Sequence, residues 1–401
     1  MNRFLPYGRQ MIDDQDIAAV AEVLRSDWLT TGPLVEAFET QLAARVGVRF
    51  AVACANGTAA LHLAAMTLEL GPEDRVVVPT MTFLATANAV RFVGAEVVFA
   101  DVDPETGLMG PEHLVAALER AGKSHKVRAV FPVHLNGQCV DMTSLHALAE
   151  TKGILVVEDA CHALGSTYPD ADGQLVGAGS CRHGELGVFS FHPVKTIAMG
   201  EGGAVTCHQE VYRDRLRRLR SHGMHQNAHA FANPALALAA DNTPNPWYYE
   251  MPEFGYNYRV SDINCALGVS QLRKLDHFVA RRRLLADRYD RLLAPLAPRV
   301  RPVRHQPGQR PVWHLYAVRI DFDQLPMDRA ALMRSLRASG IGTQVHYLPV
   351  HMQPYYRKRY GDLDLSGARR YYQQVLSLPL FPAMEENDVD RVVEALTQLL
   401  V

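Results

Sequence analysis

Lys195 lies at the centre of GVFSFHPVKTIAMGEGGAVTC, the stretch from residue 187 to residue 207. This pattern predicts a buried β-strand, a turn that carries the lysine, a Gly-Glu-Gly-Gly turn and a second strand. In a mostly apolar setting an amine loses the stabilisation of its charged form, so its pKa falls and it can attack an aldehyde near neutral pH. Upstream, ILVVEDACHALG predicts a buried strand that ends in the carboxylate of Asp159. A lysine for an aldehyde and an aspartate for a pyridinium nitrogen are the two groups that a pyridoxal phosphate enzyme must supply.

Both residues also have ordinary alternative roles. A lone lysine in a turn is usually solvated, and a carboxylate at a strand end often caps a helix or closes a turn. The surroundings of Lys195 favour chemistry, because polar groups and glycines gather there in a way that is unusual for a plain hairpin: Ser190, His192, Gly200, Glu201, Gly202 and Gly203.

Three further positions could complete a cofactor site. CANGTAALHLA predicts a strand, a tight turn and a helix, so the amides of Gly57 and Thr58 and the Thr58 hydroxyl could hold a phosphate, although such turns are also common without a ligand. Phe83 follows the next predicted strand and could stack on a flat ring or belong to the core. His162 could bond the phenolic oxygen of the cofactor or simply pack. The order of these residues at successive strand ends favours one shared site.

The composition is that of an ordinary soluble protein. The 401 residues include 48% hydrophobic and 21% charged residues, and 41 Lys and Arg stand against 43 Asp and Glu, giving a formal net charge of −2. This balance predicts neither nucleic-acid nor membrane binding. The six cysteines show no disulfide-like or metal-like spacing, and no apolar leader opens the sequence, so we expect a cytoplasmic protein without a metal site.

Strand and helix patterns alternate through the first two thirds of the chain. Apolar runs near residues 50, 76, 97, 128, 155, 186 and 203 predict strands, and most are separated by helical patterns, so we expect an α/β fold with a mainly parallel sheet between helices. Residues 222–250 lack a steady period, which is typical of a lid, a binding loop or a partner-facing arm.

The remainder predicts a smaller α+β region. We expect a helix over 261–296, strands over 314–320 and 343–348, and helices over 328–339, 367–375 and 386–400. The chain is thus expected to form a large cofactor-binding domain at 1–262 and a small C-terminal domain at 263–401.

Several long stretches resemble the DegT/DnrJ/EryC1/StrS family of pyridoxal phosphate dependent nucleotide-sugar aminotransferases. In the order of the family, these are SDWLTTGP, NGTAALHLA, VVEDACHALGSTY, FSFHPVKTIAMGEGGAV, GYNYRVSDINCALGVSQL, VHYLPVH and LSLPLFP. The resemblance covers nearly the whole chain. It implies the aspartate aminotransferase-like fold type I, pyridoxal 5'-phosphate as cofactor and transaminase activity.

The resemblance also implies roles for single residues. Lys195 matches the lysine that binds the cofactor aldehyde, Asp159 the partner of the pyridine nitrogen and Phe83 the stacking aromatic. His162 matches a position that is His or Gln in relatives, and the matching phosphate ligands are Gly57, Thr58 and Ser190. Asn257, with Arg259 nearby, matches a residue that reaches the phosphate of the neighbouring chain, so the resemblance implies a homodimer with shared active sites. The chain departs from the family at Asn56, usually Ser, and at Ala198 and Met199, usually Thr-Thr.

Other stretches bear on the substrate. FLPYGRQMID, RSHGM and NPWYYEMPEFGYNYR resemble the subgroup that uses L-glutamate to aminate C4 of UDP-4-keto-6-deoxy-N-acetyl-L-altrosamine. Its product is UDP-4-amino-4,6-dideoxy-N-acetyl-β-L-altrosamine, on the route to pseudaminic acid. GDP-4-keto-6-deoxymannose, the precursor of perosamine, is the alternative substrate. Arg259 and four other residues could contact the sugar: Thr31, His134, His346 and Tyr347. His346 could equally be a packed histidine.

Two rival classes share this scaffold. A sugar dehydratase relative has histidine in place of the reactive lysine, so Lys195 argues against that reaction. A non-catalytic regulatory protein would keep the fold and lose the chemistry, whereas every expected catalytic position is filled here.

Overall fold

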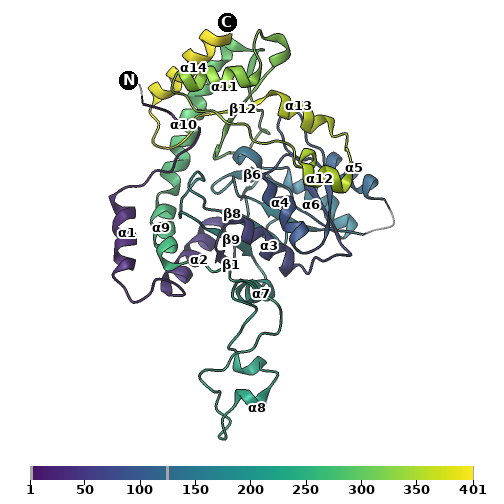
Figure 1. Cartoon of the computed structure of the whole chain (residues 1–401), viewed down its shortest axis with the longest axis vertical. Coiled ribbons are helices and arrows are strands. Elements are labelled where there is room, and N and C mark those ends of the chain that lie inside the picture. Colours follow the sequence, from purple (N-terminus) through teal and green to yellow (C-terminus); the bar gives the residue numbers. More distant parts are fainter. Residues whose placement is uncertain (1–2, 123–125, 401) are drawn as a thin grey trace.

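The computed structural model describes residues 3–122 and 126–400. The molecule has a large body, a smaller upper part that holds both ends of the chain, and an arm at the opposite end (Figure 1).

A seven-stranded sheet forms the centre of the body. Its strands are short apolar runs: β1 (Phe50–Cys54), β2 (Arg75–Pro79), β3 (Glu96–Ala100), β4 (Val127–Val130), β5 (Leu155–Asp159), β8 (Leu186–Ser190) and β9 (Gly203–Cys207). Their order is β1-β9-β8-β5-β4-β2-β3. β9 is antiparallel to β1 and β8, and the other neighbouring pairs are parallel. The predicted α/β class with a mainly parallel sheet is therefore confirmed.

Helices flank this sheet, which is why its strands are buried along most of their length. They are α2 (Pro33–Val46), α3 (Gly57–Thr67), α4 (Leu84–Phe92), α5 (Pro111–Ala121), α6 (Met142–Lys152) and α7 (Glu210–Arg220). α9 (Asp262–Arg273) packs against both α1 (Asp14–Leu24) and α2 at one side of the body (Figure 1). A separate hairpin contains β6 (Thr167–Pro169) and β7 (Leu175–Gly177).

The upper part contains a three-stranded antiparallel sheet and its helices. The elements are α10 (Leu275–Leu293), β10 (Val300–Pro302), β11 (Tyr316–Ile320), α11 (Arg329–Ala338), α13 (Ser366–Gln374), β12 (Val375–Leu378) and α14 (Glu386–Leu400). The short helix α12 (Pro354–Tyr360) packs on the body instead, where its Tyr356 belongs to the core. The strand order is β10-β11-β12. Short 3₁₀ turns lie at Leu135–Gly137, Ala228–Ala230, Ala294–Leu296, Phe322–Gln324 and Val350–Met352.

The prediction of one helix over 261–296 was wrong. The helix is interrupted at Lys274, whose ψ of 0° departs from the helical value, and the chain continues as α10. The ammonium of Lys274 lies 2.9 Å from Asp16 of α1 and also contacts Asp13. This long-range ion pair accompanies a break that no glycine or proline marks in the sequence.

The strand predicted over 343–348 was also wrong. This segment makes a single bridge, between Gln344 and Ser377, and is otherwise a loop. Its residues 344–347 line a cavity of about 560 Å³. The mixture of apolar and polar residues in this segment therefore reflects its position in a cavity wall, not the two faces of a sheet.

Two apolar cores meet along α10. Leu275 and Phe278, in its first turns, belong to the core of the body, whereas Leu285 and Tyr289 belong to the core of the upper part. Leu5 joins the second core, so the segment around Leu5 packs on the C-terminal region. The domain boundary near residue 262 stays a prediction.

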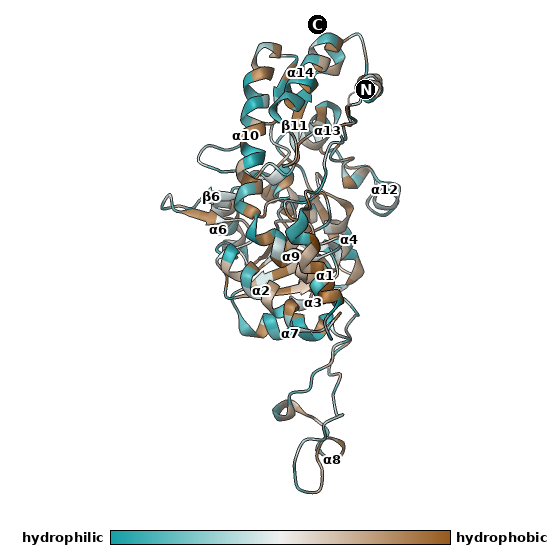
Figure 2. Cartoon of the chain, turned by 90° about the vertical axis from the view of Figure 1, so that its left-hand side faces the viewer, coloured by the Kyte–Doolittle hydropathy of each residue, from teal (hydrophilic) through white to brown (hydrophobic). Residues whose placement is uncertain are grey.

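Residues 222–250 form an arm that extends away from α7 in both views (Figures 1 and 2). It contains the short helix α8 (Pro234–Ala237) and two isolated strand pairings. Leu236 and Trp247 are 63% and 73% exposed on it. Within the described residues, no helix is both long and apolar enough to cross a bilayer.

Candidate active site

A cavity of about 560 Å³ lies at the carboxyl ends of the parallel strands. Its wall brings together most of the site residues that the sequence predicts: Gly57, Thr58, Phe83, Asp159, His162, Ser190, Lys195, His346 and Tyr347. Most of them follow strands of the large sheet, where ligands of parallel α/β sheets bind. His346 and Tyr347 come from the loop that the sequence analysis took for a strand.

Lys195 lies in the loop between β8 and β9. This loop is closed by backbone hydrogen bonds, from the Phe191 amide to Gly202 O at 2.8 Å and from the Met199 amide to Phe191 O at 2.9 Å. Burial lowers the pKa of the Lys195 amine below its ordinary value. A larger share of the amine is therefore neutral near pH 7, which suits an attack on an aldehyde and the transfer of a proton.

Asp159 ends β5 and is 4% exposed. Its Oδ2 accepts a hydrogen bond from Thr86 Oγ1 at 2.7 Å, and its Oδ1 accepts one from the Cys161 amide at 3.2 Å. The carboxylate does close a turn, which is one of its ordinary roles, but it also faces the cavity. Its orientation is fixed by one contact at each oxygen.

The start of α3 can hold a phosphate because two glycines bring it close to the sheet. Asn56 caps the helix by accepting from the Ala59 amide at 2.9 Å, so the change from the usual serine keeps a cap. A Cβ on Gly57 would lie 2.8 Å from Ser190 Cβ, and one on Gly203 would lie 2.3 Å from Asn56 O. The amides at the helix start and the Ser190 hydroxyl therefore share one corner of the cavity.

Phe83 and two histidines of the cavity differ in their exposure to solvent. Phe83 is 54% exposed and forms part of the cavity wall, so it is not a core residue. Burial lowers the pKa of His162 well below its ordinary value and that of His346 to about 3. Tyr347, whose pKa is raised by burial, lies with its hydroxyl 3.2 Å from His162 Nε2. With Tyr347 as donor, His162 carries its proton on Nδ1, which is buried and has no partner in the described residues.

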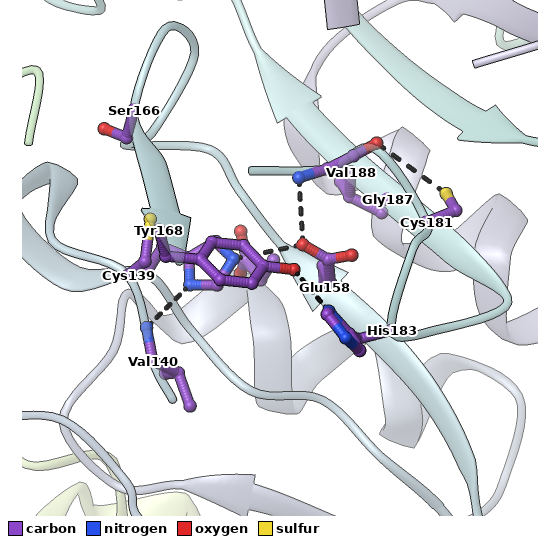
Figure 3. A network of polar contacts seen from close by, with 12 residues as sticks. Cys139, Val140, Glu158, Ser166, Tyr168, Cys181, His183, Gly187 and Val188 are labelled. Atoms are coloured by element: carbon purple, nitrogen blue, oxygen red, sulfur yellow. Dashed lines mark hydrogen bonds and ion pairs between the residues drawn. The ribbon is translucent and has the colours of Figure 1, made fainter. Parts of the chain in front are cut away.

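His134 does not line this cavity, contrary to the prediction of a sugar contact. It is fully buried beneath the site, where its Nε2 lies 3.2 Å from Glu158 Oε2 and its Nδ1 accepts from the Val140 amide at 3.1 Å. Glu158 also accepts from the Gly179 amide at 2.9 Å. Figure 3 shows Glu158 within this network, beside Tyr168. His134 thus connects the segment after β4 to the end of β5.

Three other predicted residues lie outside the cavity of the same chain. Thr31 and Arg259 line a second cavity of about 320 Å³. Asn257 is exposed, and its backbone pairs with Ser221. One chain therefore does not bring these residues to Lys195.

Several residues of the cavity wall were not predicted from the sequence. Tyr7 and His314 reach the wall from distant parts of the chain, and Thr82 and Thr86 from the segment around Phe83. The rings of His314 and His162 are 4.3 Å apart. The threonines are close enough to Phe83 in sequence to have been candidates, and Tyr7 lies within FLPYGRQMID, whereas no local signal marks His314.

The described residues fit pyridoxal phosphate. A glycine-lined helix start would hold its phosphate, Asp159 its ring nitrogen and Lys195 its aldehyde, and the unpartnered Nδ1–H of His162 suits an oxygen acceptor. The fold and the site define an aminotransferase of fold type I.

Comparison with known proteins identifies the group more closely. Residues 10–397 match the model of the DegT/DnrJ/EryC1/StrS aminotransferase family. The chain belongs to this family, and its cofactor is pyridoxal 5'-phosphate.

Individual relatives are similar over their whole length. The spore coat polysaccharide biosynthesis protein SpsC of Bacillus subtilis (strain 168) is 38% identical over 402 residues, covering 100% of this chain and 98% of that protein. The solved structure of Helicobacter pylori PseC, an aminotransferase involved in the biosynthesis of pseudoaminic acid, has a TM-score of 0.87 and 26% identity over 99% of each chain. The sugar aminotransferase Spr1654 of Streptococcus pneumoniae, described as putative and solved in its PMP form, has a TM-score of 0.86 and 28% identity over 98% of each chain.

Proposed function

We propose that this aminotransferase moves the amino group of L-glutamate to C4 of a nucleotide-linked 4-keto-6-deoxy sugar. The observation that carries the proposal is a buried lysine of lowered pKa in the same cavity as Asp159 and a phosphate-holding helix start. Relatives named for sugar amination or polysaccharide biosynthesis support a sugar as the acceptor.

The sugar that we propose is UDP-4-keto-6-deoxy-N-acetyl-L-altrosamine, as in pseudaminic acid synthesis. Support comes from the likeness to PseC over the whole chain and from the stretches FLPYGRQMID and NPWYYEMPEFGYNYR. GDP-4-keto-6-deoxymannose is the competing substrate. Because the chain is more similar in sequence to SpsC than to PseC, the two sugars must be compared by experiment.

When bound, pyridoxal phosphate supplies an aldehyde that receives the amino group and a ring that takes up electrons. The lowered pKa of Lys195 raises the neutral share of its amine, which accepts the proton from Cα of L-glutamate and would later donate it to C4′ of the cofactor. Asp159 holds a proton at the ring nitrogen, and the start of α3 with Ser190 holds the phosphate. Because glutamate leaves as 2-oxoglutarate before the ketone is aminated by the reverse steps, the kinetics should be ping-pong.

A panel of UDP-, GDP- and dTDP-linked 4-ketosugars tests the substrate. Each is incubated with L-glutamate and the holoenzyme, and 2-oxoglutarate and the amino sugar are measured by mass spectrometry. We expect the UDP-linked altrosamine precursor to have the highest kcat/KM and Lys195→Ala to abolish turnover without unfolding the protein. An active Lys195→Ala enzyme, or a preference for the GDP-linked sugar, would contradict the respective assignment.

We also propose that the enzyme is a homodimer with shared active sites, acting in the cytoplasm. Thr31, Asn257 and Arg259 lie away from Lys195 of their own chain, as residues of a partner's site would. Leu236 and Trp247 expose apolar surface on the arm, which is typical of an interface. The six cysteines are all free, as in a reducing compartment.

Subunit mixing tests the shared site. Lys195→Ala and Asn257→Ala chains are each expected to have little activity, because one lacks the reactive amine and the other a phosphate ligand. In a mixed dimer, one site has Lys195 from one chain and Asn257 from the other, so an equal mixture should recover about a quarter of wild-type activity. No recovery after verified subunit exchange would refute sharing through Asn257.

A further inference from the structure

A chain of hydroxyl groups ends on the carboxylate of Asp159. Thr82 Oγ1 lies 2.8 Å from Thr86 Oγ1, which in turn lies 2.7 Å from Asp159 Oδ2. The three residues are 2%, 1% and 4% exposed. A hydroxyl has one proton, so a Thr86 that donates to the carboxylate must accept from Thr82. The donors therefore all point toward Asp159.

We propose that Thr86 is a positioning residue that fixes the carboxylate of Asp159 for the ring nitrogen of the cofactor, and that Thr82 supports it through this chain. The inference rests on the role of Asp159 in the proposed function. The Cys161 amide holds Oδ1 and Thr86 holds Oδ2, so the plane of the carboxylate is set from both sides. Its remaining acceptor capacity serves the ring N–H.

The position of Thr86 links two walls of the cavity. Thr86 lies in the first turn of α4, and its amide donates to the carbonyl oxygen of Phe83 at 3.4 Å. The aromatic ring at the cavity wall and the hydroxyl that holds Asp159 thus belong to one helical turn. In a buried setting, successive hydrogen bonds polarise one another, so the outer hydroxyl of Thr82 strengthens the inner contact.

Binding of two cofactor forms to the cofactor-free protein tests the proposal. One is pyridoxal 5'-phosphate, and the other is its 1-deaza analogue, in which CH replaces the ring nitrogen. We expect wild type to prefer the natural cofactor. We expect Thr86→Val to weaken binding of the natural cofactor about tenfold, the size of effect produced by losing a hydrogen bond to a charged group. Binding of the analogue should not change, because it makes no contact with Asp159 through a ring nitrogen.

Three variants complete the design. Thr86→Ser keeps the donor and should retain wild-type affinity. Thr82→Val removes the outer donor and should cause a smaller loss, again for the natural cofactor alone. Thr67→Val is a matched control, because the Thr67 hydroxyl is buried without a hydrogen-bond partner in the described residues. Thr67→Val should change the affinity neither for pyridoxal 5'-phosphate nor for the 1-deaza analogue.

The outcomes separate this inference from the proposed function. If wild type bound both compounds equally, the role of Asp159 would be refuted, and this inference with it. If wild type preferred the natural cofactor but Thr86→Val weakened both compounds equally, or neither, Thr86 alone would lose its role. If Thr86→Val did not fold, Thr82→Val would serve as the test. A Thr82→Val protein that preferred the natural cofactor over the analogue as strongly as wild type would refute the role of the hydroxyl chain.

Discussion

Replacing His134 with alanine should destabilise the protein while leaving the cavity residues in place. The substitution removes the Nε2–H donor to Glu158, a fully buried carboxylate that keeps the Gly179 amide as a donor. Removing one partner of a buried charge costs about 3–5 kcal/mol. The Val140 amide also loses its acceptor, at a cost of about 1–3 kcal/mol. Since neighbouring effects are not additive, we expect the free energy of unfolding to fall by about 4 kcal/mol.

Urea unfolding of the cofactor-free protein measures this change, at one fixed protein concentration because association contributes to stability. Glu158→Gln keeps an acceptor oxygen and removes the buried charge, so it should cost less than His134→Ala. His229→Ala, on the exposed arm, is the matched histidine control and should change the stability by less than about 0.5 kcal/mol. A loss below about 1 kcal/mol for His134→Ala would refute the reasoning. Unchanged stability with a raised KM for the nucleotide sugar would restore His134 as a substrate contact.

Three further substitutions test the site and its support. Burial holds the pKa of Lys195 below its ordinary value of 10.5, so the unfolded chain binds more protons between the two pKa values and wild-type stability rises with pH there. Lys195→Met should lack this rise and make the cofactor-free protein more stable than wild type at pH 7, as urea unfolding from pH 7 to pH 10 would show. Gly203→Ala should cost about 1–3 kcal/mol and weaken cofactor binding in a titration, because its Cβ would meet Asn56 O at 2.3 Å. Arg282→Met should cost at least about 3 kcal/mol in urea unfolding, because Arg282 donates to three buried carbonyl groups, those of Trp313, His314 and Leu380.

The sequence predicted those parts of the fold that depend on local pattern. The strands of the large sheet are continuous apolar runs because helices flank the sheet, and Lys195 and Asp159 could be placed because both follow such runs. α7 was not predicted, since Leu216 and Leu219 are its buried residues in an arginine-rich segment. Two buried positions are too few to produce a recognisable helical period in the sequence.

The errors and omissions all involve contacts between distant parts of the chain. His134 has the residue type of a sugar ligand, but its buried partner Glu158 lies on β5, 24 positions further along the chain. The loop at 343–348 has the residue types of a strand, but four consecutive residues of it, 344–347, line a cavity. The hydroxyl of Thr86 gains its role from Asp159, 73 positions away in the sequence. Local spacing does not contain such information, whereas the resemblance to a family carried part of it.

The charges of the cavity argue for a second chain on grounds independent of that resemblance. Among its described wall residues, Lys195 is the one with an amino or guanidinium group, and burial lowers the pKa of Lys195. Burial also lowers the pKa of His162 and His346. The proposed substrates carry a diphosphate and carboxylates, which proteins usually bind with arginine or lysine. Arg259 lies beside the second cavity and makes no ion pair with the described residues, so a partner that presented Arg259 would supply the missing positive charge.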